Sequence, residues 1–219
     1  MYIDLKELPE RKKADVIAGL AEEIRNGALI VYPTDTVYGI GASLWSDEAL
    51  KRIYAAKDRA HDMPLILLVD SVEAVAKVAR IEAQAALFHA LTRDFWPGAL
   101  TLILEKKDNV PDLITAGGKT VGVRMPDSAA ALAVISAAGG IFPTTSANIS
   151  GEETPNAFSE LSEILKKRAD ILIDDGKCPV SLASTIVDIS RGDLRILRQG
   201  SVTEQDMRKS VSGIDIIRN

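Results

Sequence analysis

The chain has 219 residues, of which 47% are hydrophobic and 26% are charged, and its formal net charge is −5. This length and composition are typical of a globular protein with one large domain or two small ones. The acidic balance excludes a global field that draws the whole molecule to nucleic acid or to an anionic membrane, so any nucleic-acid contact needs a local basic patch.

The cysteine content and the N-terminal segment indicate the compartment. Cys178 is the only cysteine, which excludes an internal disulfide framework and a multi-cysteine metal site and is typical of a reducing compartment. It has no neighbouring histidine and no C-x-x-C partner, so we interpret it as inert. Residues 1–13 lack the apolar stretch of a signal peptide, and no apolar run approaches the ~20 residues that span a bilayer. We expect a cytoplasmic protein with no membrane partner.

Helix and strand patterns alternate along the chain. An apolar stripe predicts a first helix over residues 10–26, with Gly27 at its C-terminal stop. Ser46, Ser71 and Asp127 are expected to cap three later helices. Further helices are predicted at residues 81–95, 157–168 and 203–210, and strands at residues 28–32, 65–69, 99–104, 120–124, 141–142, 171–173, 185–189 and 194–197.

The last two predicted strands decide the type of sheet. Residues 190–193 (SRGD) lie between them and are a hairpin signal, which makes these two strands antiparallel. Elsewhere the alternation of helices and strands favours parallel pairing. No repeat, low-complexity segment or linker divides the chain. We therefore predict a single α/β domain with a twisted, mixed parallel and antiparallel sheet flanked by helices.

Four common catalytic or nucleotide-binding motifs are absent. There is no G-x-x-x-x-G-K-[ST], which excludes a P-loop, and Gly39-Ile40-Gly41 lacks the third glycine of a dinucleotide fingerprint. The two histidines, His61 and His89, lie outside any H-E-x-x-H motif and away from a cysteine pair, so a structural zinc site is not expected. G-x-S-x-G is absent as well, which argues against the hydrolase triad that goes with it.

A polar turn and a pair of cations suggest a phosphate-handling site. Residues 32–41 (YPTDTVYGIG) follow the apolar run 28–31 and offer hydroxyls and amides at a strand end, where open α/β sheets bind their ligands. Lys57 and Arg59 are two residues apart, and in an extended segment both would point to one phosphate chain while Asp58 turns away. An equally good explanation is that the two cations complement the dipole of the preceding helix and bind nothing.

Other polar residues at predicted strand ends also have two explanations. Arg124 ends a strand, where it can bind a carboxylate with two hydrogen bonds or form an exposed salt bridge. Ser146 and Asn148 present two polar side chains at positions i and i+2, but such residues often only cap a turn. Ser184-Thr185 enters an apolar strand, where the β-propensity of threonine is a sufficient explanation, and Arg198 could equally be a solvated charge. Taken singly, most of these residues need no function.

The order of these motifs along the chain is more specific than any one of them. The motifs are 32–39 (YPTDTVYG), Lys57-x-Arg59 with Pro64-Leu65, Trp96-Pro97-Gly98, 123–126 (VRMP), Ser146-x-Asn148, Ser184-Thr185 and Arg198-x-Gly200. In this order they resemble the YrdC-like family of threonylcarbamoyl-AMP synthases. The resemblance implies a YrdC-like catalytic domain at residues 10–202, with residues 203–219 as a C-terminal helix and tail of the same domain. It is closest to the short form of the family, which has no extra C-terminal domain.

The resemblance implies a reaction as well as a fold. Members of the family are nucleotidyltransferases that join L-threonine, bicarbonate or CO2, and ATP into L-threonylcarbamoyladenylate and pyrophosphate. Mg²⁺ would enter with the ATP phosphates, without a metal site of the protein itself. A partner enzyme, a tRNA-threonylcarbamoyl transferase, would then move the threonylcarbamoyl group onto A37 of tRNA. The runs 11–13 (RKK) and 166–168 (KKR) are the local basic candidates for a contact with tRNA.

The resemblance also assigns residues to the two substrates. It implies that L-threonine is bound by Thr36, Arg124, Thr144 and Ser184. It implies that ATP is bound by Lys57, Arg59, Thr120, Ser146, Thr154 and Arg198. Catalysis would depend on Lys57, Arg59, Ser146 and Asn148. Cations are the groups that this chemistry needs, because they offset the repulsion between the reacting anions, and no side-chain nucleophile is required.

Three positions depart from the family pattern, and two other functions stay open. Leu68 stands where several members have a threonine-contacting histidine, Ala60 replaces a frequent proline, and only the backbone of Met63 is expected to approach ATP. Leu68 and Met63 are therefore left out of the predicted contacts. The alternatives are a non-catalytic RNA-binding module on the same fold and a different ATP-dependent carbamoyl or adenylyl transferase. The intact S-x-N motif and the acidic charge favour an enzyme over the module.

Overall fold

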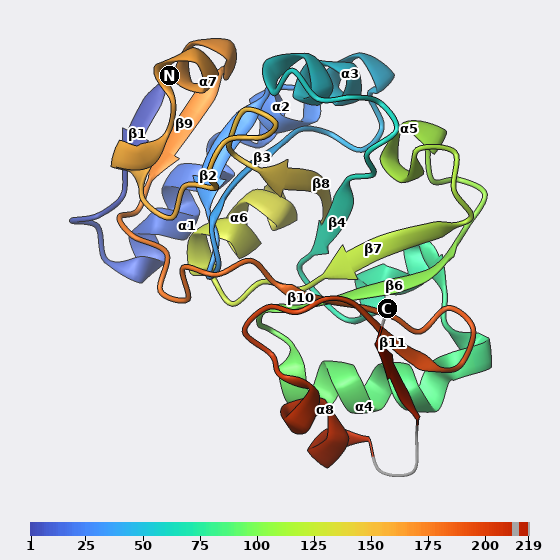
Figure 1. The fold of residues 1–219 in the computed structure, drawn as a ribbon. Coiled ribbons are helices and arrows are strands. Elements are labelled where there is room, and N and C mark those ends of the chain that lie inside the picture. The colour runs from blue at the N-terminus through green and yellow to red at the C-terminus, as the bar shows by residue number, and fades with distance from the viewer. Residues whose placement is uncertain (212–214, 219) are drawn as a thin grey trace.

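A computed structural model describes residues 1–211 and 215–218, and Figure 1 shows the path of the chain. The strands are β1 (Tyr2–Asp4), β2 (Ile30–Pro33), β3 (Tyr38–Gly41), β4 (Ile66–Val69), β5 (Ala79–Arg80), β6 (Leu100–Lys106), β7 (Thr120–Arg124), β8 (Ile141–Ser146), β9 (Ile171–Asp174), β10 (Thr185–Asp188), β11 (Leu194–Arg198) and β12 (Ile216–Arg218). In this part of the chain they form one sheet in the order β1-β9-β2-β3-β8-β4-β7-β6-β10-β11-β12, with β5 paired to β6. Some neighbours are parallel, such as β4 and β7, and others are antiparallel, such as β4 and β8. The predicted mixed sheet is confirmed.

Helices cover the sheet at several places. They are α1 (Glu10–Ala18), α2 (Ala21–Arg25), α3 (Asp47–Ala56), α4 (Ala85–Phe95), α5 (Asp112–Thr115), α6 (Ala129–Ala137), α7 (Glu163–Arg168) and α8 (Glu204–Ser210), with the 3-10 helices η1 (Glu73–Lys77), η2 (Glu82–Gln84) and η3 (Phe158–Glu160). In Figure 1, α4 and α8 lie below the strands β6, β10 and β11, while α3 and α7 lie at the opposite end. No helix in the described ranges combines the length and the apolar character that a bilayer crossing requires.

Two buried clusters hold these layers together. One joins α1, α2 and α6 to the sheet and contains Ile17, Ile24 and Val134. The other is larger and extends under α3, α4 and α8, with Leu91 and Met207 among its members. Burial of such side chains removes apolar surface from water, which is the main favourable term in folding. The C-terminal helix α8 is therefore part of the same packed unit as the sheet.

Helix boundaries follow capping residues, though not all of the predicted ones. The Ser46 side chain accepts a hydrogen bond from the Ala49 N–H at 3.2 Å, as predicted, and α3 begins there. The predicted Asp127 cap is wrong, because Ser128 occupies the N-cap of α6 and accepts from the Ala131 N–H. The predicted Ser71 cap is also wrong: the Ser71 hydroxyl donates to Asp70, and the segment that follows is the 3-10 helix η1.

Long predicted helices are divided in the structure. The helix predicted at residues 10–26 is split into α1 and α2 at Gly19 and Leu20. Glycine in a helix interior costs about 1 kcal/mol relative to alanine, so a break there is the less costly solution. The segment 81–95 is likewise η2 followed by α4, and 157–168 is η3 followed by α7 with Ser162 as the cap.

The region around the polar turn differs most from the prediction. Residues 38–41 form β3, which pairs antiparallel with β2, so Pro33 ends a strand and the rest of the PTDT sequence lies in the loop of a hairpin. Strand β8 continues through Pro143 to Ser146 instead of stopping at Phe142. The last residue pair between β3 and β8 is Gly41 with Thr144, and Pro143 lies just beyond it. On the β3 side, a proline at this position therefore removes no hydrogen bond from the sheet. Also unpredicted are β1, β5, α5 and β12.

Candidate active site

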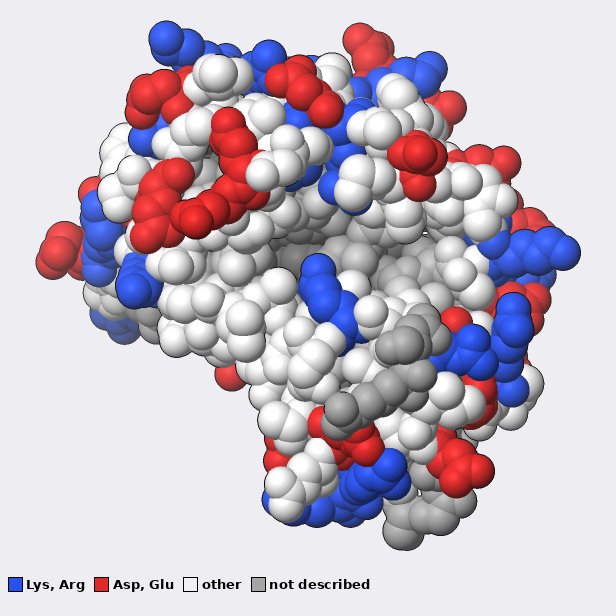
Figure 2. Space-filling model, in the orientation of Figure 1, with Lys and Arg blue, Asp and Glu red and all other residues white. Residues whose placement is uncertain are grey.

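A cavity of about 580 Å³ opens over the middle of the sheet, where Figure 2 shows a hollow. Two glycines, Gly39 and Gly122, line the cavity, where a side chain would collide with its neighbours. A Cβ on Gly122 would lie 3.0 Å from Ile66 Cγ2 and 3.1 Å from Ile103 Cδ1, and a Cβ on Gly39 would lie 2.9 Å from Thr144 Cγ2. The volume is in the range of natural ligand sites.

Nine of the eleven predicted site residues line this cavity. They are Thr36, Arg59, Thr120, Arg124, Thr144, Ser146, Thr154, Ser184 and Arg198. Lys57 and Asn148 are not among the lining residues. Leu68 and Met63, which were left out of the predicted contacts, do line it. The fold thus brings together residues that are dispersed over most of the sequence.

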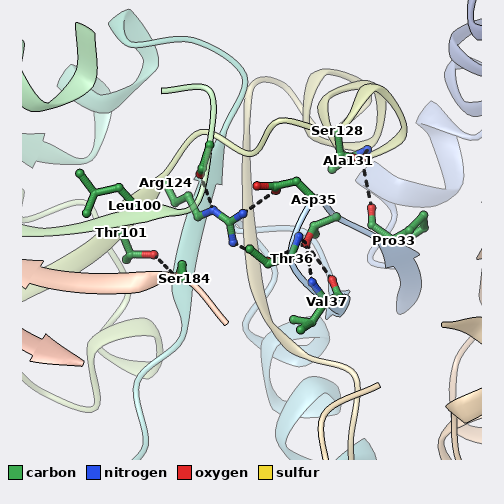
Figure 3. Close-up of polar contacts among 12 residues, drawn as sticks. Pro33, Asp35, Thr36, Val37, Leu100, Thr101, Arg124, Ser128, Ala131 and Ser184 are labelled. Atoms are coloured by element: carbon green, nitrogen blue, oxygen red, sulfur yellow. Dashed lines mark hydrogen bonds and ion pairs between the residues drawn. The ribbon is translucent and has the colours of Figure 1, made fainter. Parts of the chain in front are cut away.

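Arg124 is the most constrained cation of the cavity (Figure 3). Its side chain is only 4% exposed, with Nε donating to the Gly98 carbonyl at 2.8 Å, Nη1 to Thr36 Oγ1 at 2.8 Å and Nη2 to Asp35 Oδ1 at 2.5 Å. Burial lowers the pKa of Arg124, and the Asp35 carboxylate opposes that shift. A guanidinium has five N–H donors, and three are used here. In the described part of the chain, one N–H on each terminal nitrogen remains for a ligand.

The PTDT turn is built to hold Thr36 and Asp35 against Arg124. The Thr34 hydroxyl oxygen accepts from the N–H groups of Thr36 and Val37 at 3.1 and 3.2 Å and donates to the Val37 carbonyl at 2.7 Å. Threonine and serine form such local turns readily, so the sequence itself sets this shape. The Val180 N–H donates to the Asp35 carbonyl at 2.9 Å and ties the turn to a distant loop. Asp35 was not among the predicted site residues, although the PTDT motif contains it.

Thr144 is held by a buried phenol. The Tyr32 hydroxyl lies 2.6 Å from Thr144 Oγ1, which in turn donates to the Phe142 carbonyl at 3.2 Å. Burial raises the pKa of Tyr32, so the phenol keeps its proton. Leu68 is the register partner of Arg124 across β4 and β7, and both residues line the cavity.

Ser184 and Arg198 also line the cavity and contact each other. Arg198 donates through Nε and Nη2 to the Ser184 carbonyl at 3.1 and 2.9 Å, and Thr101 Oγ1 lies 2.8 Å from Ser184 Oγ. A Cβ on Gly200 would come 2.2 Å from the Ala183 carbonyl oxygen, so only glycine allows this approach. Burial, together with the charge of Arg124, lowers the pKa of Arg198.

Lys57 and Arg59 follow α3 but point to different places. Arg59 is half-buried and donates to the carbonyls of Met63 and Pro64, at 3.4 and 3.0 Å, in its own loop. Asp58 turns away, as predicted, and pairs with Arg168 at 3.0 Å. Lys57 is only 1% exposed and lies under the turn that contains Ser146 and Asn148. Of the two cations, only Arg59 borders the cavity.

Comparison with known proteins decides the family. The Sua5/YciO/YrdC family profile, described as telomere recombination, matches residues 22–200. The chain belongs to this family. The resemblance found in the sequence is thereby confirmed, and the catalytic sites of known relatives become relevant to the cavity.

Two curated relatives and two solved structures show the extent of the similarity. The threonylcarbamoyl-AMP synthase of Pyrococcus abyssi is 36% identical over 216 residues, which cover 99% of this chain and 62% of the relative. A putative threonylcarbamoyl-AMP synthase of Methanocaldococcus jannaschii is 33% identical over 94% of this chain and 96% of the relative. The structure of P. abyssi Sua5 complexed with L-threonine matches with a TM-score of 0.88 at 36% identity, over 99% of this chain and 62% of that chain. E. coli YciO matches with a TM-score of 0.77 at 26% identity, over 93% and 97%.

Proposed function

We propose that this protein is a nucleotidyltransferase that forms L-threonylcarbamoyladenylate and pyrophosphate from L-threonine, bicarbonate or CO2, and ATP. The observation that carries the proposal is one cavity lined both by the buried Arg124, which has two N–H groups left, and by Arg59. Relatives named threonylcarbamoyl-AMP synthase, and a similar structure complexed with L-threonine, support the choice of amino acid. The chain spans 62% of the length of the P. abyssi relative.

At the Arg124 end we place the amino acid. The two N–H groups that Arg124 has left would bind its carboxylate, while Thr36, Thr144 and Ser184 offer hydroxyls around it. Leu68 offers an apolar surface for a side-chain methyl group. These groups fix the amine so that it faces the rest of the cavity, which is the positioning that a two-substrate reaction needs.

At the Arg59 end we place ATP. Residues proposed to surround it are Arg59, Thr120, Ser146, Thr154 and Arg198, all of which line the cavity. In the reaction, the threonine amine attacks CO2 and loses a proton, forming a C–N bond. A carbamate oxygen then attacks the α-phosphorus, and the bond from that phosphorus to the pyrophosphate breaks. Because anions meet in this step, the cations Arg59 and Arg198 would lower the barrier by offsetting their repulsion.

Mg²⁺ is proposed to enter with the ATP phosphates. The cavity-lining residues in the described part of the chain include one carboxylate, Asp62. Mg²⁺ at nucleotide sites is commonly bound through phosphate oxygens, waters and one or two carboxylates, so the residues present fit this ion. When bound, the ion would neutralise charge on the phosphates.

The later steps and partners stay predictions. The product is a reactive mixed anhydride, so we propose that a partner tRNA-threonylcarbamoyl transferase uses it in the same compartment, the cytoplasm. The basic runs give little support for a direct tRNA contact. Lys166 pairs with Glu163, Arg168 with Asp58 and Lys13 with Asp175, so part of their charge is compensated within the chain.

Product analysis with the full chain tests the proposal. The protein is incubated with ATP, Mg²⁺, bicarbonate and each amino acid in turn, and pyrophosphate release and the adenylate mass are followed. We expect a threonine-dependent adenylate whose mass includes the carbamoyl carbon. A product with another amino acid would favour a different carbamoyl or adenylyl transferase. RNA binding with no product would favour the non-catalytic module.

A further inference from the structure

Lys57 has no hydrogen-bond donor left for a ligand. Its Nζ donates to the main-chain carbonyls of Ser146 and Asn148 and, at 3.3 Å, to Asn148 Oδ1. An ammonium group has three N–H donors, and all three are used. The side chain is 1% exposed and does not line the cavity. A direct contact with a phosphate would require at least one of these bonds to break.

The three acceptors all belong to one turn. Residues 146–150 begin at the last residue of β8, and the Ser150 N–H donates back to the Lys57 carbonyl at 2.9 Å. The main chain and the side chain of Lys57 therefore both hold the turn. On its other side the Ala147 N–H donates to the Tyr38 carbonyl at 2.8 Å. Carbonyl oxygens that converge on one point repel each other, and a buried cation between them offsets that repulsion.

Asn148 shows why the cation matters for the cavity. Its Oδ1 accepts from Lys57 and also from the Ser146 hydroxyl, at 2.5 Å. Its Nδ2 donates to the carbonyls of Ile149 and Glu152, at 3.0 and 2.9 Å. When the Ser146 hydroxyl turns to a ligand in the cavity, Lys57 still satisfies Asn148 Oδ1. Ser146 can therefore bind a ligand without leaving a buried oxygen unpaired, which would cost free energy.

We infer that Lys57 is a positioning residue. Its ammonium holds the 146–150 turn in the conformation that presents Ser146 to the cavity, and of the two cations Lys57 and Arg59 only Arg59 contacts the triphosphate. The K-x-R and S-x-N motifs are on this view two halves of one structural unit, joined by the Lys57 ammonium. The inference concerns the ATP end of the cavity and so rests on the proposed function for its catalytic meaning. The structural part, that Lys57 holds the turn, does not depend on it.

The first experiment measures the turn without any substrate. Hydrogen exchange of the amides of residues 146–152 is compared in the full-length wild type, Lys57→Met and Arg59→Met. The two variants are matched, because each replaces one of two cations that lie two residues apart in the sequence. We expect exchange to rise about tenfold or more in Lys57→Met and to stay at the wild-type rate in Arg59→Met. Unchanged exchange in Lys57→Met would overturn the inference, whatever reaction the protein catalyses.

The second experiment is a double-mutant cycle on ATP turnover, with kcat and the KM values for ATP and threonine measured separately. We expect Lys57→Met combined with Asn148→Ala to be no worse than the more damaging single variant within about twofold, because both break the same turn. Lys57→Met combined with Arg59→Met should multiply the single effects. The inference is overturned if the effects of Lys57→Met and Asn148→Ala multiply while those of Lys57→Met and Arg59→Met do not, because Lys57 and Arg59 would then bind one phosphate together.

A conservative variant covers the case in which Lys57→Met folds poorly. Lys57→Gln is uncharged but keeps an amide that can donate to the carbonyls of the turn. If Lys57 acts through the turn, Lys57→Gln restores protection from exchange and part of kcat relative to Lys57→Met. If its charge acts directly on the phosphates, Lys57→Gln restores protection from exchange but is as inactive as Lys57→Met, and the inference is overturned. Absence of threonine-dependent product in the wild type would instead refute the proposed function, while the exchange result still decides the role of Lys57.

Discussion

The two cationic ends of the cavity are built in different ways. Arg124 is 4% exposed, has the Asp35 carboxylate as counter-ion and uses three donors on groups of the protein (Figure 3). Arg59 is half-buried, and the hydrogen bonds of its side chain go to backbone carbonyls of its own loop, Met63 and Pro64. Arg124 is therefore buried and in contact with its carboxylate counter-ion, whereas Arg59 is half-buried, bonded to its own loop and only near the Asp62 charge. We expect Arg59 to be the more adjustable of the two.

This difference matches the ligands proposed for the two ends. A carboxylate is small and planar, and two N–H groups in a fixed plane bind it specifically. A triphosphate carries several charges over a longer distance and changes shape during the reaction, so a cation that can move is better suited to follow it. The predictions below test whether rigidity at one end and adjustability at the other have separate consequences.

The largest effect is expected for Arg124→Lys. A lysine ammonium has three donors, and Asp35, Thr36 and Gly98 already require three, so none remains for a carboxylate. We expect threonine-dependent pyrophosphate release to fall roughly 100-fold or more, mainly through the KM for threonine, while the KM for ATP stays within about twofold. Steady-state kinetics measure this, with Arg80→Lys, outside the cavity, as the control. An unchanged KM for threonine would remove Arg124 from the amino-acid site.

At the adjustable end, Arg59→Ala should act on ATP alone. Its side chain bonds only backbone carbonyls of residues 63 and 64, so its loss leaves little else unpaired. We expect the KM for ATP to rise about 10- to 100-fold with the KM for threonine and the melting temperature nearly unchanged. Asp58→Asn is a matched control, since the neighbouring Asp58 faces Arg168 and not the cavity, and asparagine tolerates its left-handed φ of 48°. A similar loss in both variants would show that the loop and not the cation is responsible.

Asp35→Asn compares a buried ion pair with an exposed one. Arg124 and Asp35 are each 4% exposed at the side chain, so removal of the carboxylate charge leaves a buried cation uncompensated, and we expect a loss of roughly 2–4 kcal/mol in the free energy of unfolding. Asp58→Asn breaks the exposed pair with Arg168 and should cost about 1 kcal/mol or less. Chemical denaturation measures both. Equal losses would mean that Arg124 does not depend on Asp35.

The two ends also differ in how far the sequence could predict them. Thr36 and Arg124 are 88 residues apart, and the residues alone did not show that they touch; the family resemblance, based on the order of the motifs, put them in one site. The structure shows their contact at 2.8 Å. Asp35 was missed because a counter-ion is recognised by its distance from a cation, and no local pattern reports that distance.

At the other end a local rule was applied where it does not hold. Residues i and i+2 share a face only in an extended segment, and that was the basis for placing Lys57 and Arg59 together. In the structure Lys57 keeps a helical conformation at the C-cap of α3 and Asp58 has a φ of 48°, so the chain turns between them. The type of sheet was predictable because hairpin and helix–strand signals are local, whereas the direction of these two side chains depends on one left-handed residue.

The two ends should also differ in pH dependence. Burial, together with the nearby Arg59 charge, lowers the pKa of Lys57 from 10.5 to about 7, so the ammonium that holds the turn is present in only part of the folded molecules near neutral pH. An arginine such as Arg124 stays protonated over this whole range. Between pH 7 and 10 the unfolded chain therefore binds a proton at Lys57 that the folded chain has partly released, so this residue makes stability rise with pH, by at most about 1.4 kcal/mol per pH unit. We expect denaturation curves of the wild type to gain stability relative to Lys57→Met from pH 7 to 9. Added ATP should flatten this gain, because a bound anion raises the pKa of Lys57. If the free energy of unfolding of the wild type and of Lys57→Met changes in parallel with pH, the Lys57 ammonium persists in the folded state. The two ends of the cavity would then differ in rigidity but not in titration.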